Sequence, residues 1–336
     1  ASPIAPPAPP SEPGAHPRDR LPRSLGLGDA TMLIVASVVG SGIFFTPSRV
    51  VGLLPSAGPY LLVWLAGRLA VPIPNEHTDR YRQKARDLGV YIQTASFLEK
   101  DDRYPGHVFN TTCLIGPEGL LTKYRKVHPW IPWEVHASPH DLPHYEEDMF
   151  PVAETEIGRL GAATCYDWLF PEAIRQLALA GAEVLIRVSA YMDPWGATPP
   201  MDWWTVVNRC RALENMAYVV AANQGASAEH YPPFSWPGGS MVVDYDGRLL
   251  AQADPGPGEK IVVAPIDLAA LRAERDYRRG HHMLAHLRTE AYRGYRQPIY
   301  PGSLAGGAVT LSVEQNERSI AAAKASLAAT LPSAQP

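Results

Sequence analysis

Cysteine is scarce in this chain, and no surplus of positive charge is present. Three cysteines in 336 residues cannot form a disulfide framework, which favours a reducing compartment, so we expect a cytoplasmic protein. The 30 Lys and Arg residues stand against 34 Asp and Glu residues, for a net charge of −4 at pH 7. A nucleic-acid binder usually carries a basic surplus that contacts phosphates, so we expect no nucleic-acid partner.

Charge is also missing from a stretch near the start of the sequence. Residues 30–48 and 50–67 contain no charged side chain, and only Arg49 separates them. Each run is close to the roughly 20 apolar residues that a membrane-spanning helix needs. Membrane association through residues 30–67 is therefore the alternative to a purely cytoplasmic location.

The composition divides the chain into four parts. Residues 1–24 hold eight prolines and few large apolar side chains, which predicts disorder. Residues 25–71 form the apolar segment. Residues 72–296 alternate helix and strand signals, which predicts an α/β domain. Residues 297–336 are a C-terminal tail with one helix expected near 313–329.

Local signals within the domain place several elements. A polar helix is predicted over 75–88, and Gly89 ends it. A hairpin is predicted around the turn at Gly119, and a short strand over 261–265. Because several strands are joined by hairpins, a simple parallel doubly wound sheet fits the sequence poorly.

Clusters of metal ligands are scarce as well. His282 and His286 are four residues apart and would share one face of a helix, with His281 beside them. No third ligand with the spacing of a zinc site accompanies them. We therefore interpret them as surface histidines and expect neither a metal nor a cofactor.

Cys165 occupies a place where a nucleophile is often found. It follows an apolar strand predicted over 160–164, and a helix with Pro171 in its first turn begins shortly after it. A thiol between a strand end and a helix start is exposed, and its thiolate is stabilised there. The competing interpretation is a buried, inert cysteine. We interpret Cys113, inside a hairpin strand, and Cys210, inside a helix of the type that packs on the sheet, as inert.

A lysine and a glutamate eight residues apart strengthen the catalytic interpretation. Lys126 follows the end of a predicted strand, and Glu134 closes the segment HPWIPWE after it. A buried lysine can stabilise an oxyanion, and a carboxylate beside it fixes its charge and position. With Cys165, these residues form a candidate catalytic set.

Three segments, in this order, resemble the nitrilase superfamily of carbon–nitrogen hydrolases. They are KYRKVHPWIPWE at 123–134, GAATCYDWLFPEAIR at 161–175 and RCRALENMAYVVAANQ at 209–224. The lysine-to-glutamate spacing and the Trp-Pro context are most similar to the aliphatic amidase branch. The resemblance covers about residues 72–296.

This resemblance implies a four-layer α-β-β-α sandwich that forms homo-oligomers and acts without metal or cofactor on a small amide or nitrile. It implies that Cys165 attacks the amide or nitrile carbon and forms a thioester acyl-enzyme. Lys126 and the backbone N–H of Tyr166 would stabilise the oxyanion, and Glu134 would position the lysine. The expected substrate-binding side chains are Tyr166, Tyr191 and Trp195.

One part of the family pattern is missing from this sequence. The family carries a general-base glutamate at the end of its second strand, well before the lysine, whereas this chain has no glutamate between Glu12 and Glu76. Glu76 lies at a predicted helix start, where a carboxylate interacts favourably with the helix dipole. We therefore predict a sandwich that lacks its usual N-terminal strand-helix-strand portion.

The segment in its place has a resemblance of its own. LGLGDATMLIVASVVGSGIFFTPSRVV at 25–51 resembles the first transmembrane segment of amino acid–polyamine–organocation transporters, whose unwound Gly-Ser-Gly-Ile portion binds substrate. The resemblance covers only about residues 25–70, which is too short for a transporter. An apolar segment that packs on the hydrolase domain is the alternative.

The sequence as a whole predicts a cysteine-dependent hydrolase of non-peptide C–N bonds. It would convert an amide to a carboxylic acid and ammonia through a thioester, with activity impaired by the missing base. The first alternative is an inactive, truncated or rearranged nitrilase-like protein. The second is a membrane-anchored module that binds small amides.

Overall fold

A computed structural model describes residues 70–131, 133–193, 196–226, 236–296, 299–300 and 312–330. The apolar segment at 30–67 and the predicted substrate contact Trp195 lie outside the described residues. The prediction that the sandwich lacks its N-terminal strand-helix-strand portion also concerns residues outside the described ranges. Among the helices of the described ranges, none combines the length and the apolar character needed to cross a bilayer.

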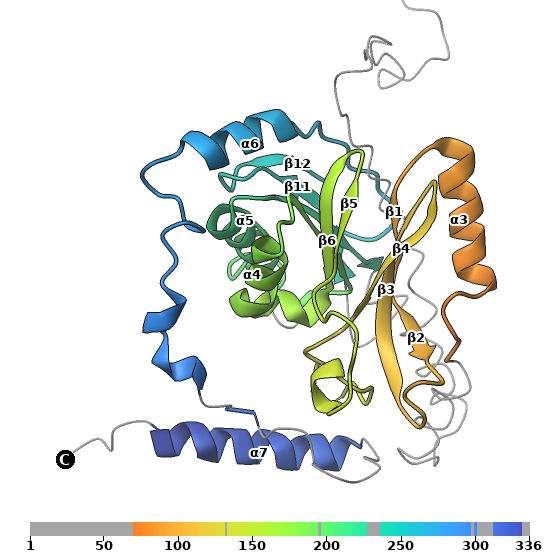
Figure 1. The fold of residues 1–336 in the computed structure, drawn as a ribbon, viewed down its shortest axis with the longest axis vertical. Helices are drawn as coiled ribbons and strands as arrows, with labels where there is room; N and C mark the ends of the chain where they lie inside the picture. The colour runs from red at the N-terminus through yellow and green to blue at the C-terminus, as the bar shows by residue number, and fades with distance from the viewer. Residues whose placement is uncertain are drawn as a thin grey trace, which may run out of the picture.

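Two sheets face each other in the middle of the molecule (Figure 1). The first sheet is antiparallel: β4 pairs with one edge of β3, and β1 and β2 pair with its other edge. Its strands are β1 (Ile92–Gln93), β2 (Phe97–Lys100), β3 (Val108–Gly116) and β4 (Gly119–Arg125).

The second sheet has the strand order β12-β11-β8-β7-β6-β5. Its central strands β6, β7 and β8 are parallel, β5 and β11 are antiparallel to them, and β12 is antiparallel to β11. The strands are β5 (Val152–Thr155), β6 (Gly158–Thr164), β7 (Val184–Ser189), β8 (Tyr218–Asn223), β11 (Met241–Val243) and β12 (Leu249–Gln252). The short strands β9 (Gly225–Ala226) and β10 (Trp236–Pro237) form a separate pair.

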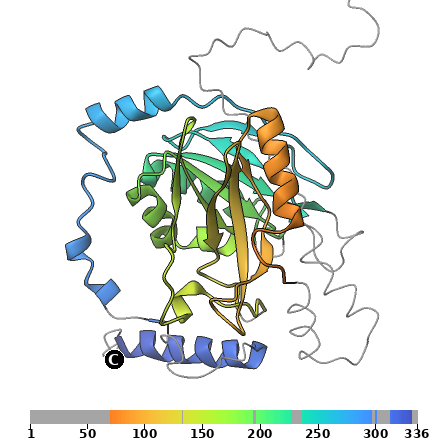
Figure 2. The ribbon, with the colours of Figure 1, turned by 45° about the vertical axis from the view of Figure 1, so that its right-hand side comes forward.

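Helices cover the outer faces of the two sheets, which gives the predicted α-β-β-α order (Figures 1 and 2). Helix α3 (Glu76–Leu88) packs Ala85 against Cys113 of β3. Helices α4 (Pro171–Leu179) and α5 (Trp203–Asn215) pack on the second sheet around Leu185. Between the sheets, Leu114 of β3 lies in one apolar core with Ala162 of β6. Burial of each apolar sheet face by another layer stabilises this arrangement.

The local signals of the sequence set several element boundaries. Asn75 caps α3 by accepting hydrogen bonds from the backbone of His77 and Thr78, and Gly89 ends it with a left-handed φ of 62°. Glu76 is exposed in the first turn of α3, as the helix-start interpretation predicts. The strand predicted at 261–265 is wrong, because the segment pairs with no strand in the described residues and Ile261 is 72% exposed.

Two further helices follow the sheets. Helix α6 (Leu268–Tyr277) buries Leu268 and Leu271 against the inner face of the second sheet. Helix α7 (Val313–Thr330) matches the helix predicted in the tail and lies apart from the other helices (Figure 1). Its Asn316 side chain donates a hydrogen bond of 3.1 Å to the backbone carbonyl of Glu134, which connects the tail to the loop after β4.

Candidate active site

The candidate site lies where two strands from different sheets end. Lys126 is the first residue after β4, and Cys165 follows β6 as the first residue of the 3-10 turn η3 (Cys165–Leu169). The loop after Lys126 is fixed to this turn by His128, whose backbone N–H and Nδ1 donate to Asp167 Oδ1 at 2.8 and 2.9 Å. Because Asp167 is fully buried, this contact locks the two segments together.

Lys126 and Glu134 form a short ion pair. Lys126 is fully buried, and its Nζ donates to Glu134 Oε2 at 2.5 Å. The same oxygen accepts a 2.6 Å hydrogen bond from the Trp130 backbone N–H and faces His136 Nε2 at 3.2 Å. The carboxylate is therefore held from three sides, and it in turn fixes the position of the lysine.

This pair keeps both of its charges. Burial alone would lower the pKa of Lys126, but the negative charges of Glu134, Cys165 and Asp167 outweigh it, and the pKa is raised. Burial alone would raise the pKa of Glu134, but Lys126 and His136 outweigh it, and the pKa is lowered well below its usual range. A buried ammonium is thus available to stabilise negative charge.

Cys165 has an unusual backbone conformation. Its φ of +48° lies in the left-handed region, which is uncommon for a residue with a side chain. Such conformations collect at functional sites, where the surrounding structure maintains them. Cys165 is partly exposed, whereas Cys113 is buried in the sheet and its pKa is raised to about 12, chiefly by burial. Cys165 therefore combines access with cationic surroundings.

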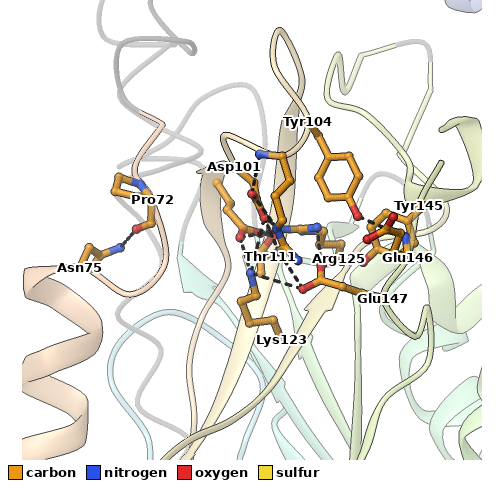
Figure 3. Close-up of polar contacts among 12 residues, drawn as sticks. Pro72, Asn75, Asp101, Tyr104, Thr111, Lys123, Arg125, Tyr145, Glu146 and Glu147 are labelled. Atoms are coloured by element: carbon orange, nitrogen blue, oxygen red, sulfur yellow. Dashed lines mark hydrogen bonds and ion pairs between the residues drawn. The ribbon is translucent and has the colours of Figure 1, made fainter.

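A network of charged side chains anchors β4 just before Lys126 (Figure 3). The Arg125 guanidinium donates twice to Glu99, through Nε and Nη2 at 2.8 Å each. It also donates to Asp101 and to Glu147 at 2.6 Å each, while Lys123 donates to Glu99 at 2.8 Å. Since the side chains of Arg125 and Glu99 are each 1% exposed, this network fixes the strand end that carries the lysine.

The predicted substrate-binding tyrosines lie near Cys165. Tyr191 is buried, and the Asn223 side chain holds its backbone: Asn223 Oδ1 accepts from the Tyr191 N–H at 2.7 Å, and Nδ2 donates to its carbonyl at 3.2 Å. Burial, together with the charges of Cys165 and Tyr166, raises the pKa of Tyr191 to about 12, although Arg187 opposes this. Burial raises the pKa of Tyr166, and Lys126 opposes it.

Sequence reasoning missed several residues of this site. His136 orients Glu134 and has its other ring nitrogen 3.2 Å from the Ala137 carbonyl. Nothing local in the sequence marks His136 or Asn223. Arg187 could have been recognised from the sequence, because it is the only charged residue within the apolar run 184–188 and a charge buried in a strand is unusual.

The histidines considered as metal ligands have other contacts. His282 Nε2 lies 2.9 Å from the Arg275 backbone carbonyl, and the rings of His282 and His286 are 6.3 Å apart. In the part of the chain that the structure describes, no group of three or more His, Cys, Asp or Glu side chains is placed to hold a metal ion.

Known proteins resemble this chain over the described domain. The family model for carbon-nitrogen hydrolases matches residues 52–276. Deaminated glutathione amidase of the rat, Rattus norvegicus, is 33% identical over 217 residues, which are 62% of this chain and 63% of the rat protein. The chain thus spans less than two thirds of the length of this relative.

Solved structures share the fold. The carbon-nitrogen hydrolase of Helicobacter pylori is 26% identical with a TM-score of 0.55, and the match covers 66% of this chain and 76% of that protein. An amidase from Nesterenkonia is 25% identical with a TM-score of 0.50, covering 66% and 74%. The structure of its glutamate-to-glutamine variant shows covalent addition of the acetamide moiety of fluoroacetamide at the active-site cysteine.

Proposed function

We propose that this chain, which belongs to the carbon-nitrogen hydrolase family, hydrolyses an amide to a carboxylic acid and ammonia through a thioester on Cys165. The observation that supports this most is the buried Lys126–Glu134 ion pair, which interacts electrostatically with Cys165. The covalent adduct at the active-site cysteine of the Nesterenkonia amidase supports a cysteine nucleophile here.

In the proposed reaction the Cys165 sulfur attacks the amide carbon and forms a C–S bond. The carbonyl oxygen gains negative charge, which the Lys126 ammonium and the Tyr166 backbone N–H stabilise. Collapse of this intermediate breaks the C–N bond, and the nitrogen leaves as ammonia after it takes up the proton that the thiol lost. Water then attacks the thioester, which releases the acid and restores the thiol. Tyr191 and Tyr166, together with Trp195, are proposed to contact the acyl group.

The second half of this reaction lacks an identified base. Glu76 is exposed at the start of α3 and pairs with His77 at 3.7 Å, a placement that suits a helix start. General-base assistance is typically worth about 10²–10⁴ in rate. We therefore propose that the acyl-enzyme forms and that water releases it slowly. A protein without any turnover remains the second candidate, and the missing glutamate is the observation in its favour.

Amide turnover by the full chain tests this proposal. With formamide, acetamide and propionamide, we expect slow ammonia release, accumulation of an acyl-enzyme visible by intact-protein mass spectrometry, and loss of both in Cys165→Ala. Cys210→Ala is the matched control, because Cys210 is exposed on α5 and should not matter. Ammonia release that persists in Cys165→Ala would refute the nucleophile, whereas no adduct and no ammonia with any amide would favour the inactive protein.

We further propose that the protein is a cytoplasmic homo-oligomer of the aliphatic amidase type. The eight-residue spacing of Lys126 and Glu134 supports the branch. Apolar side chains exposed on α4 and α5 support an interface between copies, because large exposed apolar patches are unusual on monomers. These side chains are Leu179, Trp203, Val206 and Leu213, between 44% and 56% exposed.

Sedimentation analysis checks the oligomer. We expect the mass of the wild-type protein to be a multiple of 36.7 kDa. The Val206→Glu variant should have the mass of one copy, because the substitution would bury a charge at the interface. Ile261→Glu is the control, since Ile261 is 72% exposed outside these helices. A wild-type protein with the mass of one copy at micromolar concentration would exclude this interface.

A further inference from the structure

Arg187 is a fully buried cation surrounded by aromatic rings. It lies on β7, and its guanidinium carbon is 4.3 Å from the ring centre of Trp204, 5.4 Å from that of Trp168 and 5.5 Å from that of Tyr191. Cation–π contacts of this kind are strongest when they are desolvated, as they are here. We refer to these three rings as the Arg187 cage.

The cage is held rigidly in place. Trp168 Nε1 donates to the Ala163 carbonyl at 3.1 Å, and Trp204 Nε1 donates to the Gly239 carbonyl at 2.8 Å. The rings of Tyr191 and Trp204 stack with their centres 6.4 Å apart. The rings therefore hold the Arg187 guanidinium in one orientation.

In the described part of the chain, the hydrogen-bond acceptor of Arg187 is an amide and not a carboxylate. Its Nη1 donates to Asn208 Oδ1 at 2.8 Å, while Nε and Nη2 have no hydrogen-bond partner among the residues that the structure describes. Burial lowers the pKa of Arg187 to about 10, which leaves it charged at neutral pH. A buried charge without a counter-charge is costly, so a nearby negative group is needed to offset it.

Arg187 lies close to Cys165 in the fold. It is paired across the sheet with Ala163, two residues before Cys165, and its guanidinium carbon is 5.4 Å from the ring centre of Trp168, three residues after Cys165. The other charged side chains of this region have ion-pair partners: Lys126 pairs with Glu134, Asp167 with His128, and Arg211 with Glu214. Among the residues that the structure describes, the charge of Arg187 is therefore available to the sulfur.

We propose that Arg187 is a positioning residue that stabilises the negative charge of the Cys165 sulfur from within its aromatic cage. The inference rests on the proposed function, in which Cys165 is the nucleophile. Lys126 then stabilises chiefly the substrate oxyanion, because Glu134 already balances the charge of Lys126 in the free protein. Arg187 stabilises the negative charge of the sulfur before the sulfur attacks the amide, and again when water breaks the thioester. The two buried cations therefore have separate tasks.

Alkylation of Cys165 by iodoacetamide, followed by peptide mapping of the full chain, tests this. We expect Arg187→Gln to slow alkylation at pH 7 roughly tenfold, because a neighbouring opposite charge typically favours the charged form of a group by such factors or more. At pH 10 the rates should converge, since Arg187 itself begins to lose its proton and its charge. Arg187→Lys should restore most of the rate at pH 7, which a purely structural role would not predict.

Arg275→Met is the matched control. Burial also lowers the pKa of Arg275, but this residue donates to the carbonyls of Met216 and Ala182, before the amino ends of β8 and β7. Cys165 follows the carboxyl end of β6, so the control variant should alkylate at the wild-type rate. If Arg187→Gln fails to fold, as judged by near-ultraviolet circular dichroism, Arg187→Met replaces it under the same criteria.

The outcomes separate this inference from the proposed function. Rapid alkylation of wild-type Cys165 combined with an equal rate in folded Arg187→Gln overturns the role of Arg187 alone. Equal rates in Arg187→Gln and Arg187→Lys, both below wild type, also overturn it, because the charge would then be irrelevant. If wild-type Cys165 reacts no faster than Cys210, the nucleophile assignment itself fails.

Discussion

Replacing Lys126 by methionine is expected to slow acylation of Cys165 by about 10²–10³, the usual loss when one oxyanion donor is removed. Methionine has nearly the length of lysine and no charge, so the oxyanion loses its stabilising ammonium. Rapid-mixing mass spectrometry of the acyl-enzyme measures the effect directly. The same loss is expected for Glu134→Gln, because Lys126 would lose the carboxylate that holds its charge and position.

Lys123→Met is the control for this experiment. Lys123 lies three residues earlier on β4 and pairs with Glu99, in the anchoring network rather than in the site. Arg125 still donates twice to Glu99 without it and keeps the strand end in place, so acylation per folded molecule should stay close to the wild-type rate. The double variant Lys126→Met/Glu134→Gln removes the unpaired buried carboxylate that the single change leaves behind, and it should be as inactive while folding better. Acylation of Lys126→Met at the wild-type rate would exclude the oxyanion role.

Replacing Arg125 by methionine is expected to lower the free energy of unfolding by about 3–5 kcal/mol, as is typical when one partner of a buried ion pair is removed. Arg125 donates to Glu99, Asp101 and Glu147, and these carboxylates would lose their main cation. Urea unfolding followed by tryptophan fluorescence measures the change. Because Lys126 is the next residue, the variant should also lose acylation activity as the strand end loosens.

Arg103→Met provides the comparison within the same network. Arg103 contacts Asp101 and Glu147 at 2.6 and 2.9 Å, but its side chain is 52% exposed. Exposed ion pairs contribute only about 0–1 kcal/mol. A similar loss of stability in both variants would contradict the view that burial of Arg125 makes it the centre of the network.

Much of the fold can be read from local signals. The helix over 75–88 was predictable because Asn75 accepts from backbone N–H groups at its start and Gly89 adopts the left-handed conformation at its end. The hairpin of β3 and β4 follows from its glycine turn. The strand expected at 261–265 was wrong: the segment is apolar enough for a strand, but it pairs with no strand among the described residues and leaves Ile261 and Val263 exposed.

The order of the three motifs and the position of Cys165 after an apolar strand were visible in the sequence itself. They point to the family and to the candidate nucleophile, because both depend only on residue type and spacing. The absence of a glutamate between Glu12 and Glu76 can be read from the sequence in the same way. The eight-residue interval between Lys126 and Glu134 also reflects a local loop, in which the Trp130 backbone N–H donates to the Glu134 carboxylate.

The tertiary structure alone decided how these residues are held. The contact between His128 and Asp167 spans 39 positions, and the cage around Arg187 of β7 is built from Trp168 of η3, Trp204 of α5 and Tyr191. Sequence spacing cannot predict such pairs, because the energy of a charge depends on its burial and on which groups surround it after folding. The sequence thus specified the chemical groups of the site, and packing of the second sheet against its helices determined their charges and orientation.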